Sequence, residues 1–233
     1  MKRMIDSVAV VSGGMDSVTL LYWMMEFDYT PHVISFDYGQ KHVKELEMAN
    51  YHATHLGLLH TIVPLTGLNT LLKSALTSSE EEVPEGHYAA DNMKATVVPN
   101  RNMIMMSIAA GLLISEHGDT LAVGVHAGDH QIYPDCRPEF IVHMETTLKL
   151  ANSGFLDPHF QIVAPFVYMG KHDIAAIGKD FNVDYSKTWS CYKGQSLHCG
   201  RCGTCVERKE AFDLAKMQDP TAYETDYDTE PVA

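Results

Sequence analysis

Two groups of residues in this 233-residue chain have types and spacings that suit chemistry, and the first is the hexapeptide SGGMDS at residues 12–17. It interrupts a hydrophobic run. A strand, a glycine-rich turn and a helix together direct free backbone N–H groups and the positive end of a helix dipole toward an anion. The turn lacks the lysine of a G-x-x-x-x-G-K-[ST] phosphate loop. The alternative interpretation is a tight turn followed by a well-capped helix, with Asp16 or Ser17 as the cap.

The second group is four cysteines spaced C-x7-C-x2-C-x2-C: Cys191, Cys199, Cys202 and Cys205. Four thiolates at such short intervals can close a tetrahedral zinc site, and Gly200 and Gly203 suit the turns that follow two of the ligands. An iron–sulfur cluster is the alternative, but a ferredoxin run continues x3-C-P, and residue 209 is Lys209. Because four protein thiolates leave no coordination position open, we predict one structural zinc ion per chain.

Composition limits the classes of partner. The 17 basic and 30 acidic residues give a formal net charge of −13, which opposes binding to a polyanion such as a nucleic acid. No signal peptide is visible, and no window reaches the ~18 continuous apolar residues of a membrane span. We therefore expect a cytoplasmic protein with small-molecule substrates, no nucleic-acid partner and no membrane partner.

The elements that must position these residues alternate along the chain. Strands are expected at 7–11, 32–36, 120–125 and 160–166, and helices at 16–26, 43–56, 102–117, 139–152 and 171–181. This order predicts an α/β fold, a parallel twisted sheet with helices on both faces. We divide the chain into an α/β domain at 1–187 with an exposed insertion at 77–93, a cysteine segment at 188–212 and an acidic tail at 213–233.

The SGGMDS turn resembles the S-G-G-x-D-S signature of the PP-loop ATP pyrophosphatases, which are similar in fold to adenine-nucleotide α-hydrolases and cleave ATP between its α and β phosphates. The resemblance implies that ATP is bound along Val11, Ser12, Gly13, Gly14, Met15, Asp16, Ser17, Val18, Thr19, Leu20 and Leu21. It also implies catalytic roles for Asp16, as a Mg²⁺ ligand, and for Ser17. The missing lysine suits this chemistry, because backbone amides can stabilise pyrophosphate as a leaving group.

Three further segments narrow the resemblance: FDYGQKHVKELEMA at 36–49, VPNRN at 98–102 and GVHAGDHQIYPDCRPEF at 124–140. Together with the cysteines they resemble one branch of the PP-loop enzymes, the 7-cyano-7-deazaguanine synthases of queuosine precursor biosynthesis. The match runs from about Val8 to Phe212. It implies a homodimeric ligase that converts 7-carboxy-7-deazaguanine, ammonia and ATP into the nitrile, through an acyl adenylate and an amide.

Within this resemblance five further residues are assigned roles as hypotheses. Asp135 would accept hydrogen bonds from the guanine-like base, with a turn-capping aspartate as the alternative. Arg101 and Arg137 would hold the substrate carboxylate or the phosphates, since arginine suits planar anions, with surface ion pairs as the alternative. Lys171 would lie near the phosphates, and Asp129 would face the same pocket. A sixth residue, Tyr133, is grouped with the substrate-binding residues.

Several nearby positions bear on these hypotheses. Asn100 stands where the family pattern P-x-R-N more often has glycine, and Gly128 stands where an acidic residue commonly precedes the aspartate. His126 and His130 could mimic a metal site, but with 13 histidines in the chain chance explains their placement better.

Two other functions remain open. A PP-loop enzyme that modifies tRNA, such as a thiolase, would also adenylate its target and can carry clustered cysteines, although the net charge of −13 disfavours RNA binding. A nucleotide-sensing module would hold ATP without chemistry. Tight binding to tRNA would favour the first, and the absence of pyrophosphate release would favour the second.

Overall fold

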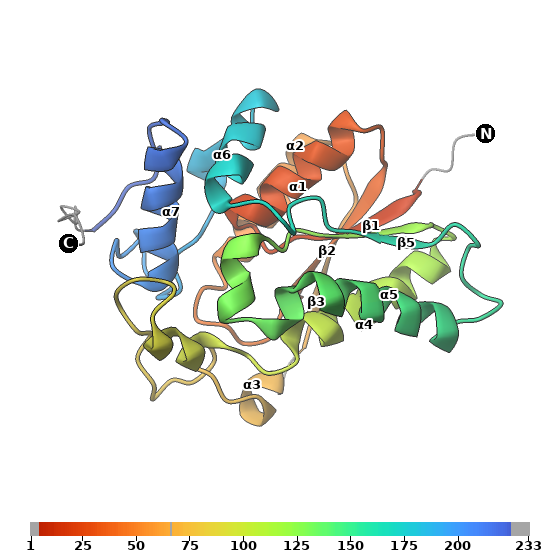
Figure 1. Cartoon of the computed structure of the whole chain (residues 1–233), viewed down its shortest axis with the longest axis horizontal. Helices are drawn as coiled ribbons and strands as arrows, with labels where there is room; N and C mark the ends of the chain where they lie inside the picture. Colours follow the sequence, from red (N-terminus) through yellow and green to blue (C-terminus); the bar gives the residue numbers. More distant parts are fainter. Residues whose placement is uncertain (1–4, 66, 225–233) are drawn as a thin grey trace.

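The computed structural model describes residues 5–65 and 67–224. Within them one sheet of five parallel strands has the order β3-β2-β1-β4-β5 (Figure 1). Its strands are β1 (Ser7–Val10), β2 (Pro31–Asp37), β3 (His60–Pro64), β4 (Thr120–Val123) and β5 (Gln161–Val163). The predicted α/β class with a parallel sheet is therefore confirmed.

Helices cover both faces of the sheet, with α1, α2 and α6 above it and α4 and α5 below it in the view of Figure 1. The bounds are α1 (Met15–Glu26), α2 (Glu45–His55), α3 (Leu68–Leu71), α4 (Arg101–Ser115), α5 (Pro138–Ala151), α6 (Lys171–Asp180) and α7 (Gly203–Leu214). Short 3₁₀ turns are η1 (Asp91–Thr96), η2 (Ala127–Gln131), η3 (Pro134–Cys136) and η4 (Tyr185–Lys187). Helix α7 packs against α6, which packs against α1.

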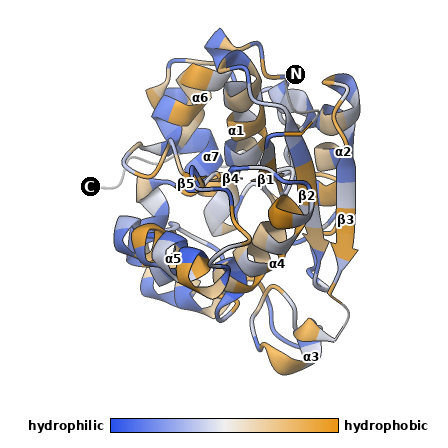
Figure 2. Cartoon of the chain, turned by 90° about the vertical axis from the view of Figure 1, so that its right-hand side faces the viewer, coloured by the Kyte–Doolittle hydropathy of each residue, from blue (hydrophilic) through white to orange (hydrophobic). Residues whose placement is uncertain are grey.

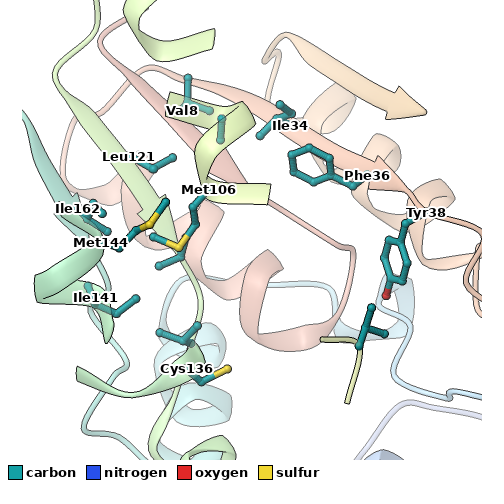
Figure 3. Close-up of a cluster of buried hydrophobic side chains, with 14 of the residues drawn as sticks. Val8, Ile34, Phe36, Tyr38, Met106, Leu121, Cys136, Ile141, Met144 and Ile162 are labelled. Atoms are coloured by element: carbon teal, nitrogen blue, oxygen red, sulfur yellow. The ribbon is translucent and has the colours of Figure 1, made fainter. Parts of the chain in front are cut away.

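Side chains that alternate along each strand build two apolar layers. Below the sheet, Val8, Leu121 and Ile162 of three strands pack with Met106 of α4 and Met144 of α5 (Figure 3). Above it, the alternate residues of the strands, including Ala9 and Val33, pack with α1 and α6. Figure 2 shows the apolar and polar faces of these helices. The two layers hold the carboxyl ends of the strands rigidly, and the loops that follow them build the site.

Strand β3 and helix α7 were not predicted, and neither was the four-residue helix α3. Strand β3 lies at the edge of the sheet, and its Ile62 is 43% exposed, so the strand lacks the continuous apolar run by which buried parallel strands are identified. Helix α7 begins inside the cysteine segment, where Cys202 and Gly203 form its start. Its helical periodicity is obscured because the cysteine spacing is set by a different requirement.

The apolar stretch 91–115 is long enough to cross a membrane by length and composition alone. In the structure it is divided into η1 and α4, and α4 packs against β1 and β4. Asn100 separates the two with a left-handed φ of 61°. Glycine adopts this conformation without strain, which accounts for the glycine that the family pattern has there.

The expected insertion and the expected tail both contact the cysteine segment. Most of residues 77–93 are exposed, but Val83 and Met93 are buried, and Glu85 forms an isolated bridge with Cys202. Residues 213–214 belong to α7, so the expected boundary at 212 falls inside a helix. Beyond α7 the chain turns back, and Asp219 accepts hydrogen bonds from the buried Arg208. Residues 225–233 of the expected tail lie outside the described residues.

Candidate functional site

The strand order places a topological switch point between β1 and β4, because the chain leaves these neighbouring strands toward different parts of the fold. In open α/β sheets, ligands bind at the carboxyl ends of the strands at such a point. A cavity of about 210 Å³ lies there. Its lining includes most of residues 10–17, which begin at the last residue of β1, and residues 123–125, which begin at the last residue of β4. The sheet therefore brings the SGGMDS turn and the loop after β4 to one cavity.

Within the SGGMDS turn, the Ser17 hydroxyl is the organising group. It accepts from the backbone N–H groups of Ser12 and Gly13, at 3.2 and 3.3 Å, and lies 3.1 Å from the Gly14 carbonyl, to which it donates. Gly14 is the N-cap of α1, and no side chain caps the helix. The helix-cap interpretation of Asp16 and Ser17 is therefore wrong. The amides of Met15 and Asp16 begin α1, where backbone N–H groups have no acceptor within the helix.

Gly13 fixes the turn against α2. Its φ is +99°, and a Cβ there would lie 1.9 Å from the Glu45 carbonyl oxygen and 2.9 Å from the Ala49 nitrogen. Both atoms belong to a helix backbone, so they cannot rotate away. The Gly13 carbonyl also accepts from the Trp189 N–H at 2.9 Å.

We therefore expect Gly13→Ala to disrupt the turn and the packing of α2. The expected cost is about 2–4 kcal/mol of unfolding free energy, from left-handed strain plus overpacking. Urea denaturation followed by circular dichroism measures it. Gly57→Ala is the matched control, because Gly57 also has a positive φ, +68°, but nothing lies within 4 Å of its added Cβ. Equal losses in the two variants would contradict a steric role for Gly13.

A buried cluster of charged groups lies beside the turn. Lys171, the first residue of α6, places its Nζ 2.5 Å from Glu207 Oε2 and 3.4 Å from Asp16 Oδ2. His126 Nε2 lies 3.8 Å from Asp16 Oδ2 and 3.4 Å from Asp129 Oδ2. The His126 Nδ1 atom accepts from the Gly128 N–H, so a neutral ring carries its proton on Nε2. The structure thus brings the predicted residues Asp16, Asp129 and Lys171 together.

The charge balance of this cluster is negative. Burial disfavours the charged form of Lys171, but the carboxylates of Asp16 and Glu207 overcome that effect and raise its pKa. Burial raises the pKa of Glu207 against the opposing charge of Lys171. Asp16 Oδ1 is buried and has no hydrogen-bond partner in the described part of the chain. An unpaired buried carboxylate oxygen is costly, so this atom is a candidate ligand for a cation.

Aromatic and polar side chains line the remainder of the cavity. Arg101, the first residue of α4, places its Nη1 3.5 Å from the Tyr38 hydroxyl, and its guanidinium lies 5.9 Å from the centre of the Tyr133 ring. The rings of His42 and Tyr192 lie side by side, with their centroids 5.2 Å apart and their planes tilted by 46°. Flat rings beside a guanidinium suit a planar anionic heterocycle.

Three predicted substrate-binding residues, Tyr133, Asp135 and Arg137, do not line the cavity of about 210 Å³, and each has a hydrogen-bond partner within the protein. Asp135 Oδ2 accepts from the Asn102 N–H at 3.0 Å, which satisfies an amide in the first turn of α4 and not one of its own turn. Arg137 Nε donates to the His130 carbonyl at 2.8 Å. Tyr133 lies between Thr96 and Tyr192, with hydroxyl separations of 2.7 and 3.4 Å, and lines a smaller adjacent pocket.

The four cysteines form a candidate metal centre. They are fully buried, and the Sγ atoms of Cys191, Cys199, Cys202 and Cys205 all lie within 4.8 Å of one another. Sulfur separations of 3.5 and 4.0 Å match the ~3.8 Å edge of a tetrahedron with 2.3 Å metal–sulfur bonds. The Cys202 N–H points to Cys199 Sγ at 3.3 Å, and Gly200 has the left-handed φ of 74° that the turn requires. The predicted grouping is confirmed and is compatible with a structural metal.

Sequence patterns missed two carboxylates of the cavity lining, Glu207 and Glu45, and the adjoining imidazole of His126. Glu207 follows Cys205 by two positions, and only the direction of α7 shows that it reaches Lys171. His126, attributed to chance, is 1% exposed and adjoins two carboxylates. Glu45 lies within the segment FDYGQKHVKELEMA, and nothing in that segment distinguishes it from its exposed neighbour Glu47. The one indication in the sequence is that Glu45 and His126 lie within segments that carry the family resemblance, and that Glu207 lies two residues after the last cysteine.

Comparisons with known proteins agree with this geometry. The family model described as "Queuosine biosynthesis protein QueC" matches residues 6–216. Proteins named 7-cyano-7-deazaguanine synthase from Brucella ovis and Brucella canis are each 47% identical over 218 residues, covering 94% of this chain and 93% of theirs. The NMN synthetase structure from Francisella tularensis shares the fold, with a TM-score of 0.51 and 11% identity over 91% of this chain and 78% of that one. The chain thus belongs to the QueC family of queuosine biosynthesis proteins.

Proposed function

We propose that the protein is an ATP-dependent ligase that converts 7-carboxy-7-deazaguanine and ammonia into 7-cyano-7-deazaguanine. The observation that carries the proposal is the 47% identity with proteins named for this product, over 94% of the chain. The site adds support, because a lysine-free anion-binding turn and a buried lysine face one cavity.

The reaction explains why such a turn is useful. A carboxylate at neutral pH has no good leaving group, so its oxygen attacks the α phosphorus of ATP and displaces pyrophosphate. Ammonia converts the acyl adenylate into an amide. Activation of the amide oxygen by a second ATP then allows the loss of that oxygen and gives the nitrile, so one phosphate site serves both activations.

Each residue of the site has a separate role in this reaction. The amides of Met15 and Asp16 face the leaving pyrophosphate, and Lys171 neutralises its charge. Asp16 Oδ1, which is buried and has no hydrogen-bond partner among residues 5–65 and 67–224, would be a ligand for Mg²⁺ bound with ATP. Asp129 lies beside the cluster of Asp16, His126 and Lys171. Arg101 holds the substrate carboxylate. The four cysteines would hold one zinc ion, which would cross-link the C-terminal segment and take no part in the reaction.

Mass spectrometry of an incubation of the protein with ATP, Mg²⁺, ammonium and 7-carboxy-7-deazaguanine tests the proposal. We expect the amide and then the nitrile, with one AMP for each conversion. AMP formation with tRNA in place of the deazaguanine acid would instead support a tRNA-modifying enzyme. No pyrophosphate with either substrate would support a nucleotide sensor. By family likeness we also propose a cytoplasmic homodimer that acts without nucleic acid, and light scattering measures its mass.

A further inference from the structure

A buried carboxylate that has no role in the proposed chemistry lines the same cavity. Glu45 is the first residue of α2 and is 7% exposed. Its own carbonyl is the atom against which Gly13 packs, so the residue lies directly beside the SGGMDS turn. A carboxylate in this position is costly unless a partner compensates it.

Only one oxygen of Glu45 is occupied. Oε1 accepts from Gln40 Nε2 at 3.2 Å, and His42 Nε2 lies 3.5 Å from the same atom. The Gln40 amide is itself fixed, because it donates to the Phe36 carbonyl at 3.0 Å and accepts from the Tyr38 N–H at 2.9 Å. Within the described residues Oε2 accepts no hydrogen bond, and no lysine or arginine forms an ion pair with Glu45.

Among the ionisable groups around Glu45, none is better suited than Glu45 itself to accept a proton near neutral pH. Tyr38 and His42 face it from the loop after β2, with the tilted ring of Tyr192 beside His42, and Arg101 faces it from α4. Burial raises the pKa of Glu45 to about 8, although the Gln40 hydrogen bond and the Arg101 charge oppose this shift. Burial lowers the pKa of His42 to about 3, so the imidazole stays neutral. Burial raises the pKa of Tyr38 to about 12.

Because only Oε2 of Glu45 is free to accept a hydrogen bond within the described residues, the ligand must be one that needs a single acceptor oxygen. The N1–H and amino edge of a guanine-like base would engage both carboxylate oxygens, but two N–H-bearing groups, Gln40 Nε2 and His42 Nε2, already lie 3.2 and 3.5 Å from Oε1 and fill its two lone-pair sites. A small cation with several N–H donors needs only one. Building on the proposed function, we propose that Glu45 Oε2 binds the ammonium co-substrate and removes one of its protons, so that ammonia is released beside the acyl adenylate.

The step balances without another reactant. The Glu45 carboxylate takes one proton from ammonium and becomes a carboxylic acid. The nitrogen lone pair of ammonia attacks the acyl carbon, the carbon–oxygen bond to the phosphate breaks, and AMP leaves with that electron pair. The nitrogen then loses a second proton to water and becomes the amide. A base whose pKa lies near the working pH suits this transfer.

The test compares Glu45→Gln with Glu47→Gln, an exposed change on the same helix. In Glu45→Gln we expect kcat/KM for ammonium at pH 8.5, where Glu45 is ionised, to fall about 100-fold or more, the usual contribution of a general base. The deficit should shrink as the pH rises and free ammonia replaces ammonium. Hydroxylamine is uncharged at neutral pH, so formation of the hydroxamate should stay within a few-fold of the wild-type rate. Glu47→Gln should match the wild type throughout.

ATP–pyrophosphate exchange with 7-carboxy-7-deazaguanine, measured without ammonium, separates this step from the proposed function. Glu45→Gln should retain exchange, because adenylation precedes ammonia. An equal loss of exchange, ammonium use and hydroxylamine use would overturn the ammonium role and assign Glu45 to acid binding or folding. An unchanged kcat/KM for ammonium would overturn it too. If the wild type showed no exchange, the proposed function itself would fail, and the ammonium step with it.

Discussion

Replacement of Lys171 by methionine is expected to abolish pyrophosphate release and to destabilise the fold. The lysine side chain is 10% exposed, and its Nζ lies 2.5 Å from Glu207 Oε2 and 3.4 Å from Asp16 Oδ2. Its removal leaves two carboxylates buried without a cation, which costs about 3–5 kcal/mol of unfolding free energy. The loss of positive charge at the phosphates should lower kcat by about 100- to 1000-fold. Urea denaturation and a pyrophosphate assay measure the two effects.

A double variant separates the two effects. In Lys171→Met/Glu207→Gln, one of the stranded carboxylates is neutral, so most of the stability should return while the rate stays low. Lys179→Met is the matched control, since Lys179 is exposed on the same helix and should leave both quantities unchanged. Near wild-type pyrophosphate release in Lys171→Met would remove Lys171 from the phosphate site. Recovery of the rate together with the stability would show that the lysine acts only through folding.

The sequence predicts the frame of the site better than its interior. A parallel sheet needs only apolar strands that alternate with helices, and local patterns record both, so the α/β class with a parallel sheet was predicted from the order of the elements. Interior contacts depend on the directions of distant side chains. Asp135 illustrates the difficulty, because its carboxylate accepts from an amide of α4, 33 residues earlier in the chain. No local pattern distinguishes that role from base recognition.

The cysteines show the opposite case. A tetrahedral centre formed within one short segment imposes close spacing on the sequence, so all four members were identifiable together. The cysteine spacing does not show which other side chains the metal centre holds in place. Glu207 and Arg208 follow Cys205 on α7, and they point to Lys171 and to Asp219. The cysteine segment therefore contributes a carboxylate to the cavity, which only the packing of α7 against α6 discloses.

Removal of the metal is expected to have the second large effect, because α7 depends on the centre at its N-terminus. Cys202 is the N-cap of this helix, and Cys205 lies in its first turn. Without a metal, the centre leaves four buried thiols with no bond between them, and structural zinc contributes of the order of 10 kcal/mol in small domains. We expect Cys202→Ser, or treatment with a strong chelator, to lower the unfolding free energy by about 3–5 kcal/mol or more and to abolish pyrophosphate release.

Metal analysis by mass spectrometry, thermal unfolding and the pyrophosphate assay test this expectation together. The wild type should hold one zinc ion per chain, and Cys202→Ser should hold much less. Cys136→Ala is the matched control, because Cys136 is buried but lies outside the cluster. It should keep the metal, with only the modest loss of stability that a small cavity causes. A chelated protein that kept its melting temperature and its pyrophosphate release would show that α7 and Glu207 hold their positions without the metal.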